Sequence, residues 1–166
     1  MTKTELKKIL EKIVEEEADF LLPLLAQEGL DMTKNLIESN KHISGKGKKE
    51  KLSPKYKKQK KKDGYGSEPI LKRTGALLDS LYASVIKKGK KRTIEINSDL
   101  EVGKGENLFN LHQHGTKHMP IRKITNEDPA VTYDWEKKLN KKYNQLLMQR
   151  VRERAAPFVK KFKKGR

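Results

Sequence analysis

The sequence predicts an α+β fold with N-terminal helices, a small antiparallel β-sheet and a long C-terminal helix packed on that sheet. Two kinds of pattern predict it. Apolar residues recur at helical spacing over 6–25 and again over 131–151, and they alternate with polar residues over 81–97 on both sides of a turn. Helical spacing gives a helix one apolar face, and alternation does the same for a strand. Two helical blocks around one hairpin therefore predict helices that cover a sheet.

The N-terminal helix is predicted to run to about Asn40 as one long helix or two consecutive ones. Thr2 and Glu5 have the spacing of a capping box, in which each side chain bonds the other residue's backbone N–H. Pro23 removes a backbone donor, so we expect it to kink or end the helix.

A basic insertion follows at about 44–66, where Lys, Gly and Ser dominate and almost nothing is available for burial. Such a run cannot offset its ordering entropy through a core. We expect a mobile insertion, or one exposed basic turn that starts at Ser53-Pro54. Its lysines are either a solvated charge run or contacts to DNA or to an acidic partner; the candidates are Lys57, Lys58, Lys60, Lys61 and Lys62.

The middle of the chain predicts a short amphipathic segment, Ala76 to Ser80, followed by a β-hairpin. Residues 81–86 and 92–97 alternate, and Gly89 between them can accept a positive φ. Residues 108–112 fit either a short helix stopped by Gly115 or a strand, since periodicity does not separate the two.

The C-terminal part predicts a long helix whose apolar stripe contains Trp135, the only tryptophan, so we expect this helix to pack on the sheet. Pro157 is expected to end it and to leave a basic, fraying tail at about 157–166.

Length and composition fit a single domain over 1–166, since domains most often fall near 100 to 150 residues. The chain has no cysteine, which excludes disulfides and thiolate metal sites. Lys and Arg total 39 against 22 Asp and Glu, and the net charge of +17 favours polyanionic partners. No apolar run approaches the ~20 residues that cross a bilayer, so we expect a soluble protein with no membrane partner.

Three histidines, His112, His114 and His118, are the one cluster that suggests a metal. In a strand the first two would share a face, whereas in a helix they would point apart. No acidic residue lies between 109 and 122 to complete a ligand set. We therefore expect histidines of a packed or interfacial turn, and we predict no metal and no cofactor.

Catalytic motifs are missing from the sequence. Ser, His and acidic residues occur, but no nucleophile elbow places them, and no Gly-x-x-x-x-Gly-Lys-Ser/Thr phosphate loop is present. We predict no catalytic residues and a protein that is not an enzyme. A further alternative, a small hydrolase that acts in lysis, is supported by no group of residues in the sequence.

Four phrases follow one another in order between residues 52 and 122. They read Leu-Ser-Pro-Lys-Tyr at 52–56, Ile-Leu-Lys-Arg-Thr-Gly-Ala-Leu-Leu-Asp-Ser-Leu at 70–81, His-Gln-His-Gly-Thr at 112–116 and Met-Pro-Ile-Arg at 119–122. Their order and spacing resemble the phage virion morphogenesis family, the Mu-like tail completion proteins. The intervals hold a predicted hairpin where that family places its sheet.

The resemblance implies a structural virion protein of a tailed phage or prophage, which completes the tail or joins it to the head neck as a ring. The residues that match the family pattern are the candidates for the assembly motif: Thr74, Gly75, Leu78, Ser80, His112, Gln113, Gly115, Thr116, Met119, Pro120 and Arg122.

Several of these residues also have a physical role that can be argued separately. Gly75 permits a tight backbone path, and the Thr74 hydroxyl can cap the following helix. Gly115 can adopt a left-handed conformation, and Pro120 suits an edge or a turn. Arg122 can pair with a carboxylate at a subunit contact.

The partners that the resemblance implies are further copies of the chain in a ring homo-oligomer, with a hexamer considered, together with portal or adaptor and tail-tube or terminator proteins. Genomic DNA in the channel is a further candidate. The expected location is the neck or tail end of the virion, after assembly in the bacterial host cytoplasm. The alternative function is a basic protein that binds nucleic acid independently of sequence.

Overall fold

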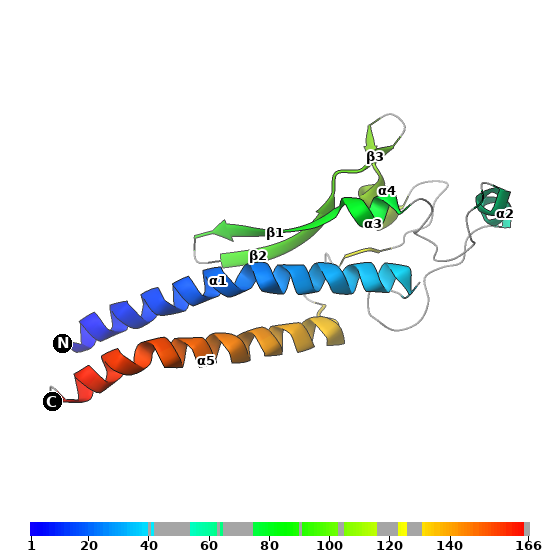
Figure 1. Ribbon diagram of the computed structural model, residues 1–166. Helices are drawn as coiled ribbons and strands as arrows, with labels where there is room; N and C mark the ends of the chain where they lie inside the picture. The colour runs from blue at the N-terminus through cyan, green and yellow to red at the C-terminus, as the bar shows by residue number, and fades with distance from the viewer. Residues whose placement is uncertain are drawn as a thin grey trace. The chain divides into compact units, whose positions relative to one another are not determined.

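The structure is a computed structural model that describes residues 1–39, 41, 54–62, 64, 75–89, 91–102, 105–115, 123–125 and 131–164. It confirms the α+β fold class, with a long N-terminal helix, a small antiparallel sheet and a long C-terminal helix (Figure 1). Among the described residues, no helix combines the length and the apolar character needed to cross a lipid bilayer.

The contacts divide the chain into two compact units. Unit 1 comprises Met1–Leu25 and Lys138–Arg166, and unit 2 comprises Ala26–Lys137. The first and last helices of the chain contribute residues to both units. The prediction of one domain over 1–166 stays a prediction.

Helix α1 (Lys3–Glu38) begins at the predicted capping box. The Glu5 N–H donates to Thr2 Oγ1 at 3.1 Å, and the Thr2 backbone nitrogen donates to Glu5 Oε2 at 2.7 Å. The hydrogen bond from the Thr2 backbone lowers the pKa of the Glu5 carboxyl. Pro23 lies inside the helix and does not end it. It removes one hydrogen bond, to the carbonyl of Asp19, and both residues are exposed, so water can bond that carbonyl instead.

Helix α5 (Asp134–Lys164) continues past Pro157, so the prediction that this proline ends the helix is wrong. The lost hydrogen bond would have joined residue 157 to the carbonyl of Glu153, and both residues are exposed. The segment predicted as a fraying tail is therefore helical as far as Lys164. Lysines in this last turn also interact favourably with the negative end of the helix dipole.

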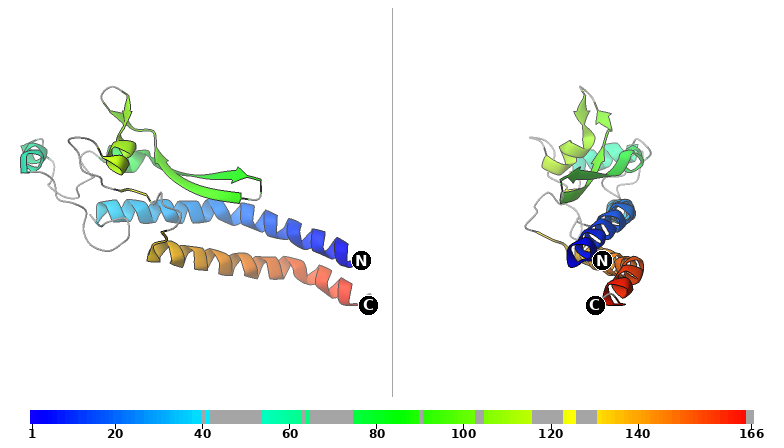
Figure 2. Two further views of the ribbon diagram at one scale, coloured as in Figure 1. Left: turned by 180° about the vertical axis from the view of Figure 1, so that it is seen from behind. Right: turned by 90° about the vertical axis from the view of Figure 1, so that its left-hand side faces the viewer.

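In unit 1, the first part of α1 and the last part of α5 run side by side and antiparallel, with both chain ends at the same end of the pair (Figure 2). The buried residues of this unit are mainly small and aliphatic: Ile13, Ala18, Leu21, Leu22 and Ala155. The described partner of α5 is thus α1. The sheet belongs to the other unit, and the packing of the C-terminal helix on it stays a prediction.

Unit 2 contains the predicted hairpin. Helix α3 (Ala76–Ser80) leads into strand β1 (Leu81–Lys88), which pairs antiparallel with β2 (Lys91–Ser98). The register runs from Leu81↔Ser98 to Lys88↔Lys91, and Gly89 in the turn has a φ of 60°. Cross-strand partners share a face of the hairpin, so the pairs Ala83↔Ile96 and Val85↔Ile94 form an apolar face.

The segment after the hairpin ends in a helix. Two short strands, β3 (Glu101–Val102) and β4 (Glu106–Asn107), pair with each other and lead into α4 (Leu108–His114). Of the two structures predicted for residues 108–112, the helix is correct. The core of unit 2 joins α1, α3, the hairpin and α4 through one buried cluster: Leu30, Ile37, Leu77, Leu78, Leu81, Phe109 and Ile124.

The basic insertion, which was expected to be mobile or to form one exposed basic turn, contains a helix. Helix α2 (Pro54–Lys62) has nine residues, and it begins at the predicted position. Proline is favoured at the first helical position because its missing N–H would be unpaired there, and lysine has a good helix propensity. The rest of the predicted insertion, apart from Gly64, lies outside the described residues.

Candidate assembly site

Gly75 is the N-cap residue of α3 and has a φ of 87° and a ψ of −23°. The predicted cap, Thr74, lies outside the described residues, and the N-cap position provides no side-chain cap. The Gly75 carbonyl accepts the first hydrogen bond of the helix, from the Asp79 N–H at 3.0 Å. A Cβ built at Gly75 would lie 3.5 Å from Asp79 Oδ2, an ordinary contact. The left-handed backbone, and not a lack of space, therefore requires glycine here.

Ser80 connects α3 to the end of β2. Its hydroxyl donates to the Leu77 carbonyl at 2.9 Å and lies 2.6 Å from Ser98 Oγ. Ser98 Oγ also accepts from the Leu100 N–H at 3.1 Å. Leu78, the neighbouring residue of the motif, is buried in the core of unit 2. This phrase of the sequence thus anchors α3 to the core of unit 2 and to the end of β2.

Asn107, which the sequence reasoning missed, caps α4. Its Oδ1 accepts from the Asn110 N–H at 3.1 Å, and its Nδ2 donates to the Ser98 carbonyl at 2.6 Å. The signal was present in the sequence, because Asn is a preferred N-cap residue and Asn107 directly precedes the apolar Leu108 and Phe109.

Gln113 uses its whole amide to hold a distant segment of the chain. Its Oε1 accepts from the Ile124 N–H at 2.7 Å and from the Thr125 N–H at 3.1 Å. Its Nε2 donates to the Thr125 carbonyl at 2.8 Å. Gln113 is only 1% exposed and Ile124 is fully buried, so the bond between them satisfies two groups that water does not reach. The two bonds to the Thr125 backbone are part-buried. We call this arrangement the Gln113 clamp.

The histidines around Gln113 point apart, as expected for a helix. His112 is half-buried and His114 is exposed, while His118 lies outside the described residues. Within the part of the chain that the structure describes, no group of three or more His, Asp or Glu side chains could hold a metal ion.

Gly115 ends α4, and its N–H donates to the Leu111 carbonyl at 2.9 Å. Its φ is 73°, which agrees with the predicted positive value, but its ψ is 179°. It is therefore outside the left-handed helical region and in a region that is essentially restricted to glycine. The other four predicted motif residues, Thr116, Met119, Pro120 and Arg122, lie outside the described residues.

Two of the four sequence phrases meet in unit 2. Leu78 of the second phrase packs in the same core cluster as Ile124, whose backbone Gln113 of the third phrase holds. Beside Gly75 there is an open cleft of about 450 Å³, which is lined on the α1 side by Asp31, Lys34, Asn35 and Glu38 and on the α3 side by Gly75, Leu78 and Asp79.

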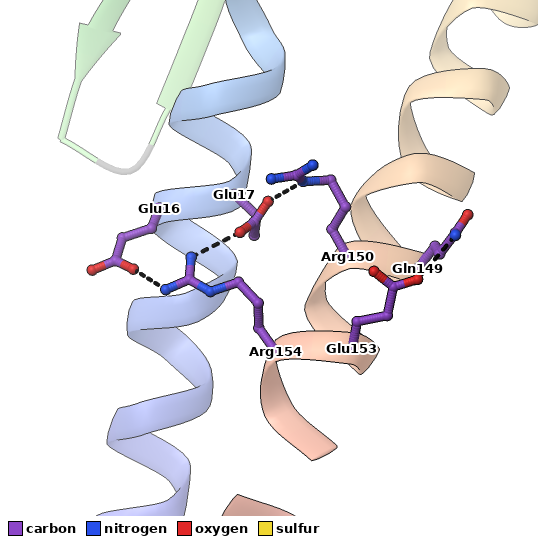
Figure 3. A network of polar contacts seen from close by, with 6 residues as sticks. All are labelled: Glu16, Glu17, Gln149, Arg150, Glu153 and Arg154. Atoms are coloured by element: carbon purple, nitrogen blue, oxygen red, sulfur yellow. Dashed lines mark hydrogen bonds and ion pairs between the residues drawn. The ribbon is translucent and has the colours of Figure 1, made fainter. Parts of the chain in front are cut away.

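A second polar network, in unit 1, joins α1 to α5 (Figure 3). The Glu17 carboxylate is 3% exposed and accepts from Arg150 Nε and, at 2.7 Å, from Arg154 Nη1. Arg154 Nη2 also bonds Glu16 Oε2 at 2.7 Å. The Arg150 guanidinium lies 4.5 Å from the centroid of the Phe20 ring, a cation–π contact. We call this network the arginine clasp.

The clasp changes the acid–base properties of its members. Hydrogen bonds from Arg150, and then from Arg154, hold the pKa of the Glu17 carboxyl below its ordinary value. Bonds to Glu17 and Glu16 raise the pKa of Arg154. The sequence reasoning missed the clasp. The available signal was Glu17 itself, because it lies one turn from Ile13 and one turn from Leu21 on a face that is otherwise apolar.

Large apolar side chains remain exposed on both helices of unit 1. On α1 they are Val14, Phe20 and Leu24, and on α5 they are Leu146, Met148 and Phe158. Single exposed apolar residues are ordinary on a monomer, but Phe20 and Leu24, one turn apart, expose 57% and 56% of their surface. These two residues form an apolar patch on α1.

Both outer edges of the hairpin lack a strand partner in the part of the chain that the structure describes. Among the described residues, β1 and β2 pair only with each other. Lys88 and Lys91 flank a two-residue turn, so they form a hydrogen-bonded pair, and bonded and non-bonded pairs alternate from there. The backbone N–H and C=O of Ala83 and Val85 in β1, and of Ile94 and Ile96 in β2, therefore point away from the partner strand.

The five lysines predicted to contact DNA or an acidic partner do not share one environment. Lys57, Lys58, Lys61 and Lys62 are exposed, whereas Lys60 is 1% exposed. Lys60 is thus excluded from the solvent-facing surface of α2.

No protein-family model, no curated protein and no solved structure matches the chain.

Proposed function

We propose that this chain is a structural virion protein of a tailed phage or prophage, which completes the tail or joins it to the head neck by forming a ring. The observation that carries the proposal is the order of four phrases between residues 52 and 122, which resembles the Mu-like tail completion proteins.

The roles of the described motif residues support an architectural function. Gly75 and Gly115 have positive φ values, Ser80 connects α3 to β2, and the Gln113 clamp fixes Ile124 and Thr125. Each of these residues shapes or holds the backbone. The proposed function needs a subunit with a fixed backbone and requires no catalysis.

The edges of the hairpin in unit 2 support self-assembly. A ring needs two different surfaces on each subunit, because a head-to-tail interface joins unlike patches and closes when the rotation permits. The hairpin offers two different strand edges, at Ala83 and Val85 on β1 and at Ile94 and Ile96 on β2. An exposed strand edge is a template for pairing with another chain.

The proposed partners are further copies of the chain, the portal or adaptor protein on the head side and the tail-tube or terminator protein on the tail side. The proposed location is the neck or tail end of the virion.

Purified particles test this function. We expect the protein in finished particles at a small and constant copy number, and particles made without it should have heads and tails that fail to join. Particles that join normally in its absence, or protein that occurs only in infected-cell extract and never in finished particles, would contradict the proposal.

A further inference from the structure

We propose that helix α2 is a binding site for the phosphate backbone of DNA, formed by a stripe of three lysines. The stripe consists of Lys55, Lys58 and Lys62, all of which are exposed. The whole helix reads Pro-Lys-Tyr-Lys-Lys-Gln-Lys-Lys-Lys and contains no acidic residue. This binding site would be an additional property of the chain, and it does not depend on the proposed virion function.

The position of Lys60 shows which side of α2 is available to a ligand. Successive residues of a helix are about 100° apart, so Lys55, Lys58 and Lys62 fall within about 60° of one another. Lys60 lies about 170° from the centre of that stripe by the same geometry, and it is the one buried residue of the helix. The stripe therefore faces away from the buried side, into solvent.

Repulsion between the lysines gives α2 a reason to bind a polyanion. Lys58 and Lys62 are four residues apart, as are Lys57 and Lys61, and like charges at this spacing destabilise a helix. No acidic residue within the helix offsets them. Phosphates along the stripe would offset the repulsion between Lys58 and Lys62, so binding should also increase the stability of the helix.

The composition of the helix favours nucleic acid over an acidic protein. The core of a protein–protein interface is apolar and depleted in lysine, yet the only large apolar side chain of α2 is Tyr56. Binding to DNA phosphates requires only charge, because affinity comes from the release of condensed counterions. The stripe supplies positive charge and contains no apolar side chain.

The purified full-length chain tests the proposal, with a short DNA duplex of random sequence and a series of salt concentrations. We expect affinity that falls steeply with salt and does not depend on sequence. Replacing Lys55, Lys58 and Lys62 together with Gln should reduce the magnitude of the log–log slope by up to about 2.7, since each phosphate contact contributes about 0.9.

A matched variant removes the same charge elsewhere. Lys160, Lys161 and Lys164 are also exposed and clustered, at the end of α5, and their replacement with Gln should change the slope much less. Hydrogen exchange over residues 54–62 should slow when DNA binds the wild-type chain. Unchanged thermal melting of both variants would show that neither has lost its fold.

Three results would overturn the proposal. The first is a wild-type chain that does not bind DNA or binds it independently of salt. The second is an equal loss of slope in the two triple variants, which would assign binding to net charge and not to α2. The third is a stripe variant that binds DNA normally but loses a particle protein as partner, which would identify an acidic protein surface as the ligand.

Discussion

Gly115 ends helix α4 in a conformation that is essentially restricted to glycine, with a φ of 73° and a ψ of 179°. Replacing it with Val should destabilise the fold by about 1 to 3 kcal/mol, the usual cost of such a backbone conformation in a residue with a Cβ. Thermal melting of the purified variant measures this effect.

Gly29 provides the control for that substitution. It lies inside α1, and a Cβ built there would be 3.9 Å from Ile96 Cδ1, an ordinary contact. Gly29→Ala should therefore leave the stability unchanged or raise it by up to about 1 kcal/mol, because alanine is the better helix former. If Gly115→Val melted at the same temperature as the wild type, a glycine would not be required at this position.

Gln113 is predicted to matter for the fold more than the two histidines beside it. Gln113→Leu would leave the buried Ile124 N–H without its acceptor, at a cost of about 1 to 3 kcal/mol for one such group. Gln113→Glu should also destabilise the fold at neutral pH, because it buries a carboxylate and places one of its oxygens against the Thr125 carbonyl, which is itself an acceptor. Chemical denaturation ranks the variants, with His114→Ala, an exposed position, as the control. If Gln113→Leu, Gln113→Glu and His114→Ala were equally stable, the Gln113 clamp would not contribute to stability.

At the scale of elements, the arginine clasp should make the α1–α5 pair sensitive to acid. The pKa of Glu17 is lowered in the folded state, so the unfolded chain binds more protons at this residue as the pH falls. The contribution of Glu17 is present above the ordinary glutamate pKa of about 4.3 and is lost as the pH falls through the lower, folded value.

Melting curves of Glu17→Gln at several pH values test this linkage. The variant should melt below the wild type at neutral pH, and the difference should shrink in acid, where the wild-type carboxyl is protonated as well. Glu153→Gln, which alters an exposed carboxylate of α5 outside the clasp, is the matched control. A constant difference across the pH range would contradict the clasp.

The strand edges lead to a prediction for ring formation. The N–H of Val85 points away from β2, whereas the N–H of the next residue, Ile86, points towards it. Val85→Pro should therefore keep the hairpin and block pairing with a neighbouring subunit, because proline is tolerated in a strand where its missing N–H would face outward. Ile86→Pro should disrupt the hairpin itself.

Circular dichroism and the solution mass of the assembled protein separate the two variants. We expect a folded Val85→Pro chain that stays monomeric. A Val85→Pro chain that assembles like the wild type would exclude the β1 edge as an interface.

At the scale of the whole molecule, assembly must overcome the repulsion between copies that each carry a net charge of +17. Added salt screens this repulsion, so self-association should strengthen with salt, opposite to the binding of DNA. Leu24→Gln should weaken self-association, because it removes one of the two residues of the apolar patch on α1, at a position that is 56% exposed.

Light scattering across a salt series measures both effects. The melting temperature of monomeric Leu24→Gln should stay close to that of the wild type, since exposed substitutions usually change stability by less than about 0.5 kcal/mol. Lys8→Gln, at another exposed position of α1, should not weaken association. Equal association of the Leu24 variant and the wild type would exclude the patch.

Elements whose signals are local could be predicted from the amino-acid sequence alone. The capping box at Thr2 and Glu5, the short helix at Ala76–Ser80, the hairpin about Gly89 and the positive φ of Gly115 all follow from residues a few positions apart. Spacing and side-chain chemistry act directly on the backbone at that range, so a single sequence is enough to predict them.

Which distant residues meet depends on the three-dimensional fold. Gln113 finds the backbone of Ile124, Glu17 finds Arg150 and Arg154, and Lys60 is buried while the lysines around it are exposed. The continuation of α5 past Pro157 also depends on the fold, because Glu153, whose carbonyl loses its partner, lies on an exposed side of the helix. Apolar periodicity predicts that one face of a helix or strand will be buried. Which element packs on that face depends on how the chain folds back on itself.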